Sequence, residues 1–278
     1  MNHTIAPNIR NPASSHPGFM LSSALCTCQV PHAFTTRGGG VSSGIFSSLN
    51  FGNPGDLPVD HRDPITNIKA NQAAVAQAIN AADRRIVEVH QVHGAAVHVL
   101  RAHQPDHSTP TDTKADALVT DDPSRLIAVR VADCTPVLLS SADGRVVAAV
   151  HAGWRGVIAG VLPAAIRAMR AIGATNIHAA IGPCISSQHF EVGPEVAEEF
   201  FKCFGKDTDF VAPHLTSPGK SFVDLKASLA SQATAMGLVM IDTLPHCTVA
   251  SPELFFSHRR DAGRTGRMMA IIGPRAVA

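Results

Sequence analysis

The chain has 278 residues, 45% of them hydrophobic, which is enough to bury a large core in one large domain or two smaller ones. Its formal net charge of +1 gives no reason to expect a nucleic-acid or membrane-surface partner. No apolar run approaches the roughly 18 residues of a membrane-spanning helix, and the six cysteines follow no disulfide spacing, so we expect reduced thiols in a cytoplasmic protein.

The N-terminal region differs in composition from the rest of the chain. Residues 1–24 are polar, rich in Asn, Pro and Ser, and show no periodicity, which predicts a partly disordered tail. No later change in composition marks a linker. We therefore expect residues 25–278 to form a single catalytic domain.

Apolar runs and helical periodicities alternate along this domain. Asp63 and Pro64 are typical of a helix start, with Asp63 as N-cap, and the helix continues with an apolar face as far as Ile79. Further helices are predicted over residues 157–172, 194–204 and 221–236. In the first of these, Gly173 is a natural C′ residue, and Pro163 either kinks the helix or begins its regular part. Strands are predicted over residues 32–37, 85–89, 126–131, 136–139, 145–150, 177–181 and 268–272.

The spacing of these elements limits the fold class. Strands and helices interleave irregularly, and several strands lie too close in sequence for a helical crossover. This pattern favours a mixed sheet in an α+β or mixed α/β domain over a regular barrel.

Three potential metal ligands follow three predicted strands. His93, Cys134 and His151 each come shortly after a strand end, and the ends of neighbouring strands commonly open into one crevice. Two imidazoles and a thiolate suit Zn²⁺, and three protein ligands leave a position open, as in catalytic zinc sites. The separations of 134 − 93 = 41 and 151 − 134 = 17 residues show no tight structural-zinc pair.

Other interpretations fit the same residues. Each histidine could be an ordinary turn residue, and Cys134 could be a buried thiol. Cys134 could also be a nucleophile, with His151 or His93 as its base. A thiolate bound to zinc is a poorer nucleophile, so the metal and nucleophile hypotheses compete.

Four arginines could complete such a site. Arg37 lies beside three consecutive glycines, Arg155 follows the His151 segment, and Arg259 and Arg260 are adjacent. Guanidinium groups bind phosphate or carboxylate through two parallel hydrogen bonds. Ordinary salt bridges would explain each arginine taken singly, whereas an anion-binding role for at least one of the four is expected.

Several motifs in order resemble one family. They are Phe34-Thr35-Thr36-Arg37, Gly39-Gly40-Val41-Ser42, Ser48-Leu49-Asn50, Gln91-Val92-His93-Gly94, Ala132-Asp133-Cys134-Thr135-Pro136, His151-Ala152-Gly153-Trp154-Arg155-Gly156, Ile181-Gly182-Pro183-Cys184-Ile185, Phe190-Glu191-Val192-Gly193, Phe222-Val223-Asp224-Leu225, Phe255-Phe256-Ser257, Arg259-Arg260-Asp261 and Thr265-Gly266-Arg267. Together they resemble the purine nucleoside phosphorylases of the peptidoglycan-editing-factor type, first described as multicopper polyphenol oxidase or laccase-domain proteins. The resemblance runs from Phe34 to about Gly273.

The resemblance implies a fold, a metal and an activity. The family fold, similar to the catalytic domain of cytotoxic necrotising factor, is a mixed β-sandwich flanked by helices. The resemblance also implies zinc, with copper as an alternative, bound by His93, Cys134 and His151, which are the catalytic candidates as well. Asn50 joins Arg37, Arg155, Arg259 and Arg260 as a substrate-binding candidate.

The implied reactions are phosphorolysis of adenosine, inosine, guanosine and methylthioadenosine, and deamination of adenosine. The expected partners are therefore a purine nucleoside and phosphate, and we expect a monomer. Alternative hypotheses are an amidase that edits peptidoglycan precursors at the same site, a copper-dependent polyphenol oxidase, and a metal-holding interaction protein without turnover.

Overall fold

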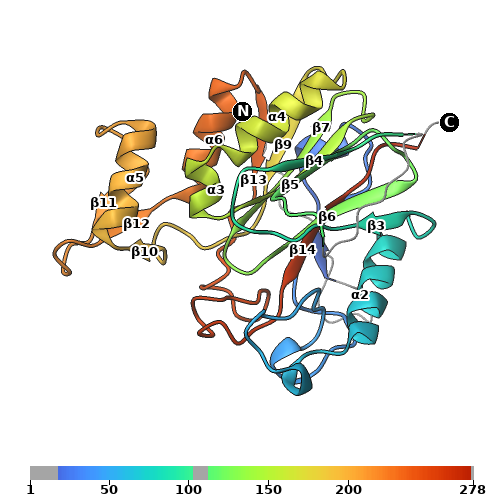
Figure 1. The fold of residues 1–278 in the computed structure, drawn as a ribbon, viewed down its shortest axis with the longest axis horizontal. Helices are drawn as coiled ribbons and strands as arrows, with labels where there is room; N and C mark the ends of the chain where they lie inside the picture. The colour runs from blue at the N-terminus through green and yellow to red at the C-terminus, as the bar shows by residue number, and fades with distance from the viewer. Residues whose placement is uncertain (1–17, 103–111, 277–278) are drawn as a thin grey trace, which may run out of the picture.

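Two mixed β-sheets pack face to face in the computed structural model, which describes residues 18–102 and 112–276 (Figure 1). The first sheet contains, in spatial order, β1 (Phe19–Met20), β2 (His32–Thr35), β14 (Met268–Ile272), β6 (Arg125–Val131) and β3 (Arg85–Val87). The second contains β13 (Met240–Thr243), β9 (Ile177–Ile181), β7 (Thr135–Ser141), β8 (Val147–Ala152), β5 (Ala117–Thr120) and β4 (Val97–Leu100). Parallel pairs (β3 with β6, β9 with β13, β4 with β5) accompany antiparallel ones in both sheets.

Helices cover the outer face of each sheet. The helices of the described residues are α1 (Ser23–Cys26), α2 (Ile65–Ala78), α3 (Trp154–Ile158), α4 (Val161–Ala171), α5 (Pro194–Phe204) and α6 (Leu225–Ala235), with 3₁₀ turns η1 (Gly44–Phe46) and η2 (Val59–His61). Helix α2 packs on the first sheet, while α3, α4 and α6 pack on the second. A small third sheet of β10 (Glu191–Val192), β12 (Ser221–Val223) and β11 (Val211–Pro213) carries α5 and extends to the left in Figure 1.

The alternation of side chains along β6 shows how one strand serves two cores. Ile127 and Val129 point between the sheets, where they join Leu138 of β7 in the central core. Leu126 and Ala128 point the other way and pack in the core beneath α2. Because both faces of the strand are covered, it is almost entirely apolar. The structure confirms the predicted mixed α+β architecture of a β-sandwich between helices.

Most predicted strands and helices are present, and the differences have local causes. Residues 177–181, 194–204 and 268–272 form β9, α5 and β14 as predicted. The predicted helix over 157–172 is divided at Gly160, whose φ of +76° ends α3 before α4 begins. Gly173 follows the C-cap of α4, as expected of a C′ residue.

The helix predicted over residues 221–236 begins later than expected. Residues 221–223 pair with both β10 and β11, so they form β12 instead. Helix α6 starts at Leu225, and the Asp224 side chain caps it by accepting a hydrogen bond from the backbone N–H of Ala227. The predicted start was therefore wrong by one short strand.

Two other predictions concern the N-terminal part of the chain. A disordered tail was predicted over residues 1–24. Residues 1–17 lie outside the described residues, and residues 18–24 contain β1 and the start of α1. Pro64, not Asp63, is the N-cap of α2. The Asp63 carboxylate instead accepts hydrogen bonds from Ser42 and Asn50. Within the described residues, no helix is both long and apolar enough to cross a membrane.

Candidate active site

Strands from both sheets bring His93, Cys134 and His151 together. Cys134 lies where the chain passes from β6 of the first sheet to β7 of the second. In the antiparallel β7–β8 pair, Pro136 is opposite His151, which places the start of β7 beside the end of β8. His151 is itself the second-last residue of β8, so it does not follow the strand as predicted.

The three side chains form one compact group of possible metal ligands. One ligand atom from each residue lies within 4.8 Å of those of the other two. The two imidazole rings meet edge to face, with centroids 4.8 Å apart and an interplanar angle of 78°. His151 is buried, Cys134 is half-buried and His93 is exposed, so the group is open to solvent on the His93 side.

A buried carboxylate orients two of these residues. Asp116, which directly precedes β5, accepts a hydrogen bond from His151 Nδ1 at 2.8 Å, assigned here as the protonated ring nitrogen. It also accepts hydrogen bonds from the backbone N–H groups of His93 at 2.8 Å and Gly94 at 2.6 Å. Nε2 of His151 is therefore the nitrogen left to face Cys134, an arrangement typical of a metal-binding histidine.

Glycine at position 153 keeps the space beside the ligand group free. A Cβ atom at this position would lie 3.0 Å from Cys134 Sγ and 3.0 Å from His93 Cδ2. The chain therefore passes closer to the group than any other residue type would allow without a shift. The two imidazoles, the thiolate and this free space fit a zinc ion with an open position.

The protonation of the group suits metal binding and also nucleophilic chemistry. Burial alone would raise the pKa of Cys134, but the positive charge of His151 and hydrogen bonds with both histidines lower it to about 6. Burial alone would lower the pKa of His151, yet the Cys134 thiolate and Asp116 raise it to about 9. At neutral pH the thiol is thus already ionised, as a metal ligand or a nucleophile requires.

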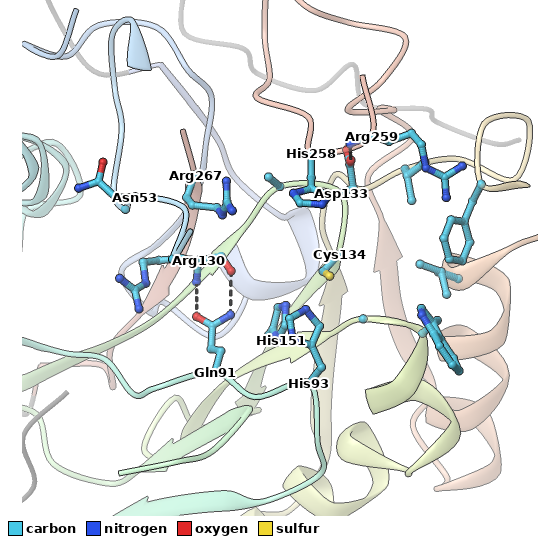
Figure 2. A pocket seen from close by; sticks show the side chains of 18 of the residues that line it. Asn53, Gln91, His93, Arg130, Asp133, Cys134, His151, His258, Arg259 and Arg267 are labelled. Atoms are coloured by element: carbon cyan, nitrogen blue, oxygen red, sulfur yellow. Dashed lines mark hydrogen bonds between the residues drawn. The ribbon is translucent and has the colours of Figure 1, made fainter. Parts of the chain in front are cut away.

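The ligand group lies in the wall of a cavity of about 540 Å³ (Figure 2). Apolar side chains line one part of it, namely Trp154, Ile185, Phe190 and Leu225. Polar side chains line another, where Figure 2 shows Asn53, Arg130 and Arg267 on the far side of the ligand group from Arg259. A volume between roughly 300 and 1,000 Å³ is usual for a small-molecule site.

Of the predicted substrate-binding residues, Arg259 lines this cavity. Its guanidinium donates to the backbone carbonyls of His189 and Glu191 at 3.3 and 3.1 Å and lies 5.5 Å from the centre of the Phe190 ring. Arg155 is exposed and covers the Trp154 ring at 4.3 Å. It is not among the residues that line the cavity.

The other predicted contacts are absent from the cavity wall among the described residues. Arg37 donates to the carbonyls of Ser47 and Pro252, both at 3.0 Å, and Arg260 forms an ion pair with Asp261 and donates to carbonyls of its own segment. Asn50 is fully buried and accepts hydrogen bonds from the backbone N–H groups of Gly52 and Arg267. These three side chains hold loops together around the cavity.

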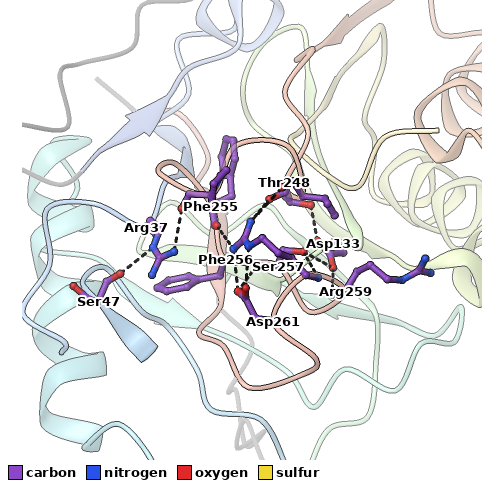
Figure 3. Close-up of polar contacts among 12 residues, drawn as sticks. Arg37, Ser47, Asp133, Thr248, Phe255, Phe256, Ser257, Arg259 and Asp261 are labelled. Carbon is purple, nitrogen blue, oxygen red and sulfur yellow. Dashed lines mark hydrogen bonds and ion pairs between the residues drawn. The ribbon is translucent and has the colours of Figure 1, made fainter. Parts of the chain in front are cut away.

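Asp133 joins the Cys134 segment to the segment that carries Arg259 (Figure 3). Its carboxylate accepts hydrogen bonds from Thr248 Oγ1 at 2.5 Å, Ser257 Oγ at 3.0 Å and the backbone N–H of Arg259 at 2.6 Å. Its φ of +81° is unusual for a residue other than glycine. This buried carboxylate therefore fixes two walls of the cavity relative to each other.

The prediction from sequence missed Asp116, Arg130 and Arg267. Arg130 is the one charged residue inside the otherwise apolar stretch 126–131 of β6, which was an available signal. Arg267 belongs to the Thr265-Gly266-Arg267 motif but was not considered as a ligand. For Asp116 the sequence offered no signal, because its role depends on the pairing of β5 with β8.

Comparisons with known proteins cover almost the whole described chain. A family model described as multi-copper polyphenol oxidoreductase laccase matches residues 31–275. A purine nucleoside phosphorylase of Mycobacterium tuberculosis is 40% identical over 248 residues, which are 88% of this chain and 92% of that protein. A purine nucleoside phosphorylase of Deinococcus radiodurans is 36% identical over 246 residues, or 88% and 89% of the two chains.

A solved structure shares the fold. The crystal structure of YlmD from Geobacillus stearothermophilus superimposes with a TM-score of 0.80 at 29% sequence identity. The match covers 98% of this chain and 100% of that one.

Proposed function

The chain belongs to the family described as multi-copper polyphenol oxidoreductase laccase, whose similar curated members are named purine nucleoside phosphorylases, and we propose that it is a zinc-dependent purine nucleoside phosphorylase. The observation that carries the proposal is the cavity that combines the His93–Cys134–His151 group with an apolar part and an arginine-rich part. A purine base can stack in the apolar part, a phosphate can bind in the arginine-rich part, and the ligand group lies in the wall of the same cavity.

In the proposed reaction, a phosphate oxygen forms a bond to C1′ of the ribose as the bond from C1′ to the purine nitrogen breaks. The electron pair of that bond stays on the base, which takes up a proton, and the products are the free base and ribose 1-phosphate. The aromatic rings of Trp154 and Phe190, with Ile185 and Leu225, offer a surface on which a purine can stack. Arginines of the cavity bind and orient the phosphate, which keeps it near the reacting carbon.

A zinc ion bound by the three ligands would supply a Lewis acid beside the reacting groups. Asp116 keeps His151 in the required tautomer, and Gly153 leaves room for the ion. Within residues 18–102 and 112–276, this is the single group of three potential metal ligands, which supports one metal ion more than a multicopper centre. Metal analysis of protein purified without added metal tests zinc against copper.

The proposal extends to the substrate range and the setting of the enzyme. We include adenosine, inosine, guanosine and methylthioadenosine as substrates, and deamination of adenosine at the same site. We also propose that residues 25–278 act as one catalytic domain of a cytoplasmic monomer. Chromatography of adenosine incubated with the protein separates adenine, formed by phosphorolysis, from inosine, formed by deamination.

The decisive test is release of hypoxanthine from inosine by the pure protein, measured by liquid chromatography with and without phosphate. We expect phosphate-dependent release by the wild type and a loss of at least 100-fold in His151→Ala, because one metal ligand is gone. His61→Ala is the matched control, since the His61 side chain is exposed and, among the described residues, pairs with the exposed Asp60 alone. Phosphate-independent release, or equal release by His151→Ala, would disprove the proposal.

A second comparison separates the metal hypothesis from a cysteine nucleophile. A chelator should abolish phosphorolysis, and zinc added afterwards should restore it. If Cys134 acted as a nucleophile without metal, the chelated enzyme would stay active and an alkylating reagent would inactivate it.

A further inference from the structure

Arg130 and Arg267 lie next to each other on one face of the first sheet. Arg130 is in β6, and in the antiparallel pair with β14 its partner is Met269. Arg267 is two residues before Met269, so its side chain points to the same face as Arg130, one diagonal step away. Figure 2 shows both guanidinium groups in the same part of the cavity, with Asn53 above Arg130.

The two guanidinium groups are not fully paired with carboxylates of the described residues. Glu88 Oε1 lies 3.4 Å from Arg130 Nε, and the other oxygen of Glu88 accepts a hydrogen bond from Gln72 at 2.8 Å. Arg267 forms no ion pair with any residue of the described chain, and its Nη1 donates only to the carbonyl oxygens of Thr265 and Gly266, at 2.9 and 3.0 Å. Among the described residues, Arg130 is therefore paired with a carboxylate, and Arg267 is not.

Nearby acids do not neutralise Arg267. The Asp133 carboxylate already accepts three hydrogen bonds, and Asp56 is exposed to solvent. Burial lowers the pKa of Arg267 most, the Cys134 thiolate raises it, and the positive charge of Arg130 lowers it again, while Asp133 and Asp56 have smaller raising effects. Two like charges held together in a partly buried wall are costly unless an anion joins them.

The loop at Gly52 closes over both arginines. A Cβ atom at Gly52 would lie 3.3 Å from Arg130 Nη1 and 3.5 Å from Arg267 Cγ. Asn50 fixes this arrangement, because its side-chain oxygen accepts hydrogen bonds from the backbone N–H groups of both Gly52 and Arg267. A glycine here therefore lets the backbone contact the arginines without displacing the guanidinium groups into the cavity.

We propose that Arg130 and Arg267 form the subsite that binds inorganic phosphate, with Asn50 and Gly52 as positioning residues. The assignment rests on the proposed function for the identity of the anion. It replaces Arg37, Arg155 and Arg260, whose guanidinium groups are hydrogen-bonded or stacked outside the cavity lining. Guanidinium forks match the geometry of phosphate oxygens better than a point charge does, and two of them can bind its opposite sides.

The test is a titration of inorganic phosphate into the zinc-loaded protein, in which calorimetry measures the heat of binding. We expect the dissociation constant to rise at least 10-fold in Arg130→Gln and in Arg267→Gln, with partial recovery in the lysine variants. Arg145→Gln is the matched control, because Arg145 is an exposed arginine whose ion pair within the described part of the chain is with Asp143. Zinc content and circular dichroism establish that each variant keeps its fold and its ligand group.

Steady-state kinetics provide a second, independent readout. The KM for phosphate should rise at least 10-fold in both variants, while the KM for inosine stays within about threefold of the wild type. Wild-type protein that binds no phosphate, variants that bind it equally well, or an equal rise in both KM values would each overturn the assignment. Weakened phosphate binding in the variants of a protein that releases no purine base would instead support the subsite and refute the phosphorylase proposal.

Discussion

At the scale of single residues, one residue of the ligand group and one residue next to it have strained backbones. His93 and Asp133 have φ values of +61° and +81°, in a region that residues with a Cβ rarely occupy. Each is held there by a buried carboxylate: Asp116 accepts a hydrogen bond from the backbone of His93, and Asp133 binds the Arg259 segment through its own side chain. Such strain is maintained where the surrounding structure determines it, and it is common at functional sites.

Gly153→Ala should weaken metal binding with little effect on the fold. The added methyl group would lie 3.0 Å from both Cys134 Sγ and His93 Cδ2, so the two side chains must move apart. We expect at least a 10-fold loss of zinc affinity, measured by competition with a chromophoric chelator, because ligands must be held in a defined geometry.

Gly55→Ala is the matched control for this change. A Cβ at Gly55 meets no atom within 4 Å, so this variant should bind zinc as the wild type does. Equal zinc affinity in Gly153→Ala and wild type would show that the ligand group tolerates the methyl group, contrary to the proposed metal site.

The sequence allowed the ligand candidates to be predicted but not the residues that orient them. His93 and Cys134 follow strands that apolar runs reveal, so each could be placed at a strand end. Asp116 and Arg267 act through neighbours that the pairing of distant strands brings close, and no local pattern encodes that pairing. Arg37 is adjacent to a glycine run, but its hydrogen bonds to Ser47 and Pro252 could be seen only in three dimensions.

At the scale of elements, the cavity depends on where two chain segments meet. The turn from β6 to β7 carries Asp133 and Cys134, and residues 248–260 carry Arg259 along one side of the cavity. The Asp133 carboxylate connects the two through Thr248, Ser257 and the Arg259 backbone, as Figure 3 shows. Residues 248–260 contain no regular helix or strand. The hydrogen bonds to Asp133 therefore hold this segment in place where backbone pairing would otherwise do so.

Asp133→Asn should destabilise the protein and loosen this segment. The amide keeps the size of the side chain but loses its charge, and its N–H₂ group would face donors. We expect a loss of about 1–3 kcal/mol in the free energy of unfolding, the usual effect of removing hydrogen bonds to a buried charge. Urea unfolding in the presence of a chelator measures this change without a contribution from metal loss.

The exposed Asp60 offers a control for the same chemical change. Asp60→Asn should alter the free energy of unfolding by less than about 0.5 kcal/mol, as expected for a surface substitution. If Asp133→Asn were equally harmless, the hydrogen bonds of Asp133 would not be what holds residues 248–260 in place.

The elements that the sequence predicted best are those with long, consistent patterns. Helix α5 has a proline at its first position and a clear apolar face, β14 is a continuous apolar run, and β9 is apolar except for His178. The missed strands, such as β4 and β13, are four residues long and carry exposed or half-buried side chains. Their conformation is set by pairing with β5 and β9, so a local pattern could not reveal them.

At the scale of the whole molecule, the ligand group lies where the two sheets are connected. His93 is in the chain segment between β3 of the first sheet and β4 of the second, Cys134 is in the connection from β6 to β7, and His151 is in β8. The irregular spacing of the strands predicted a mixed sheet. The division into two packed sheets was predicted by the family resemblance alone. A metal ion at this place would join segments from both sheets, and its binding would therefore favour the folded state of the entire domain.

Zinc should raise the melting temperature of the wild type and leave that of His151→Ala almost unchanged. An ion that binds the folded state stabilises it by about 2.7 kcal/mol at a free concentration 100 times its dissociation constant. For a domain of this size that corresponds to a rise of roughly 5–10 °C, which scanning calorimetry in a zinc buffer measures. His61→Ala, which leaves the three ligands intact, should show the full rise. An equal rise in His151→Ala would place the stabilising zinc elsewhere, because two ligands cannot hold the ion as tightly as three.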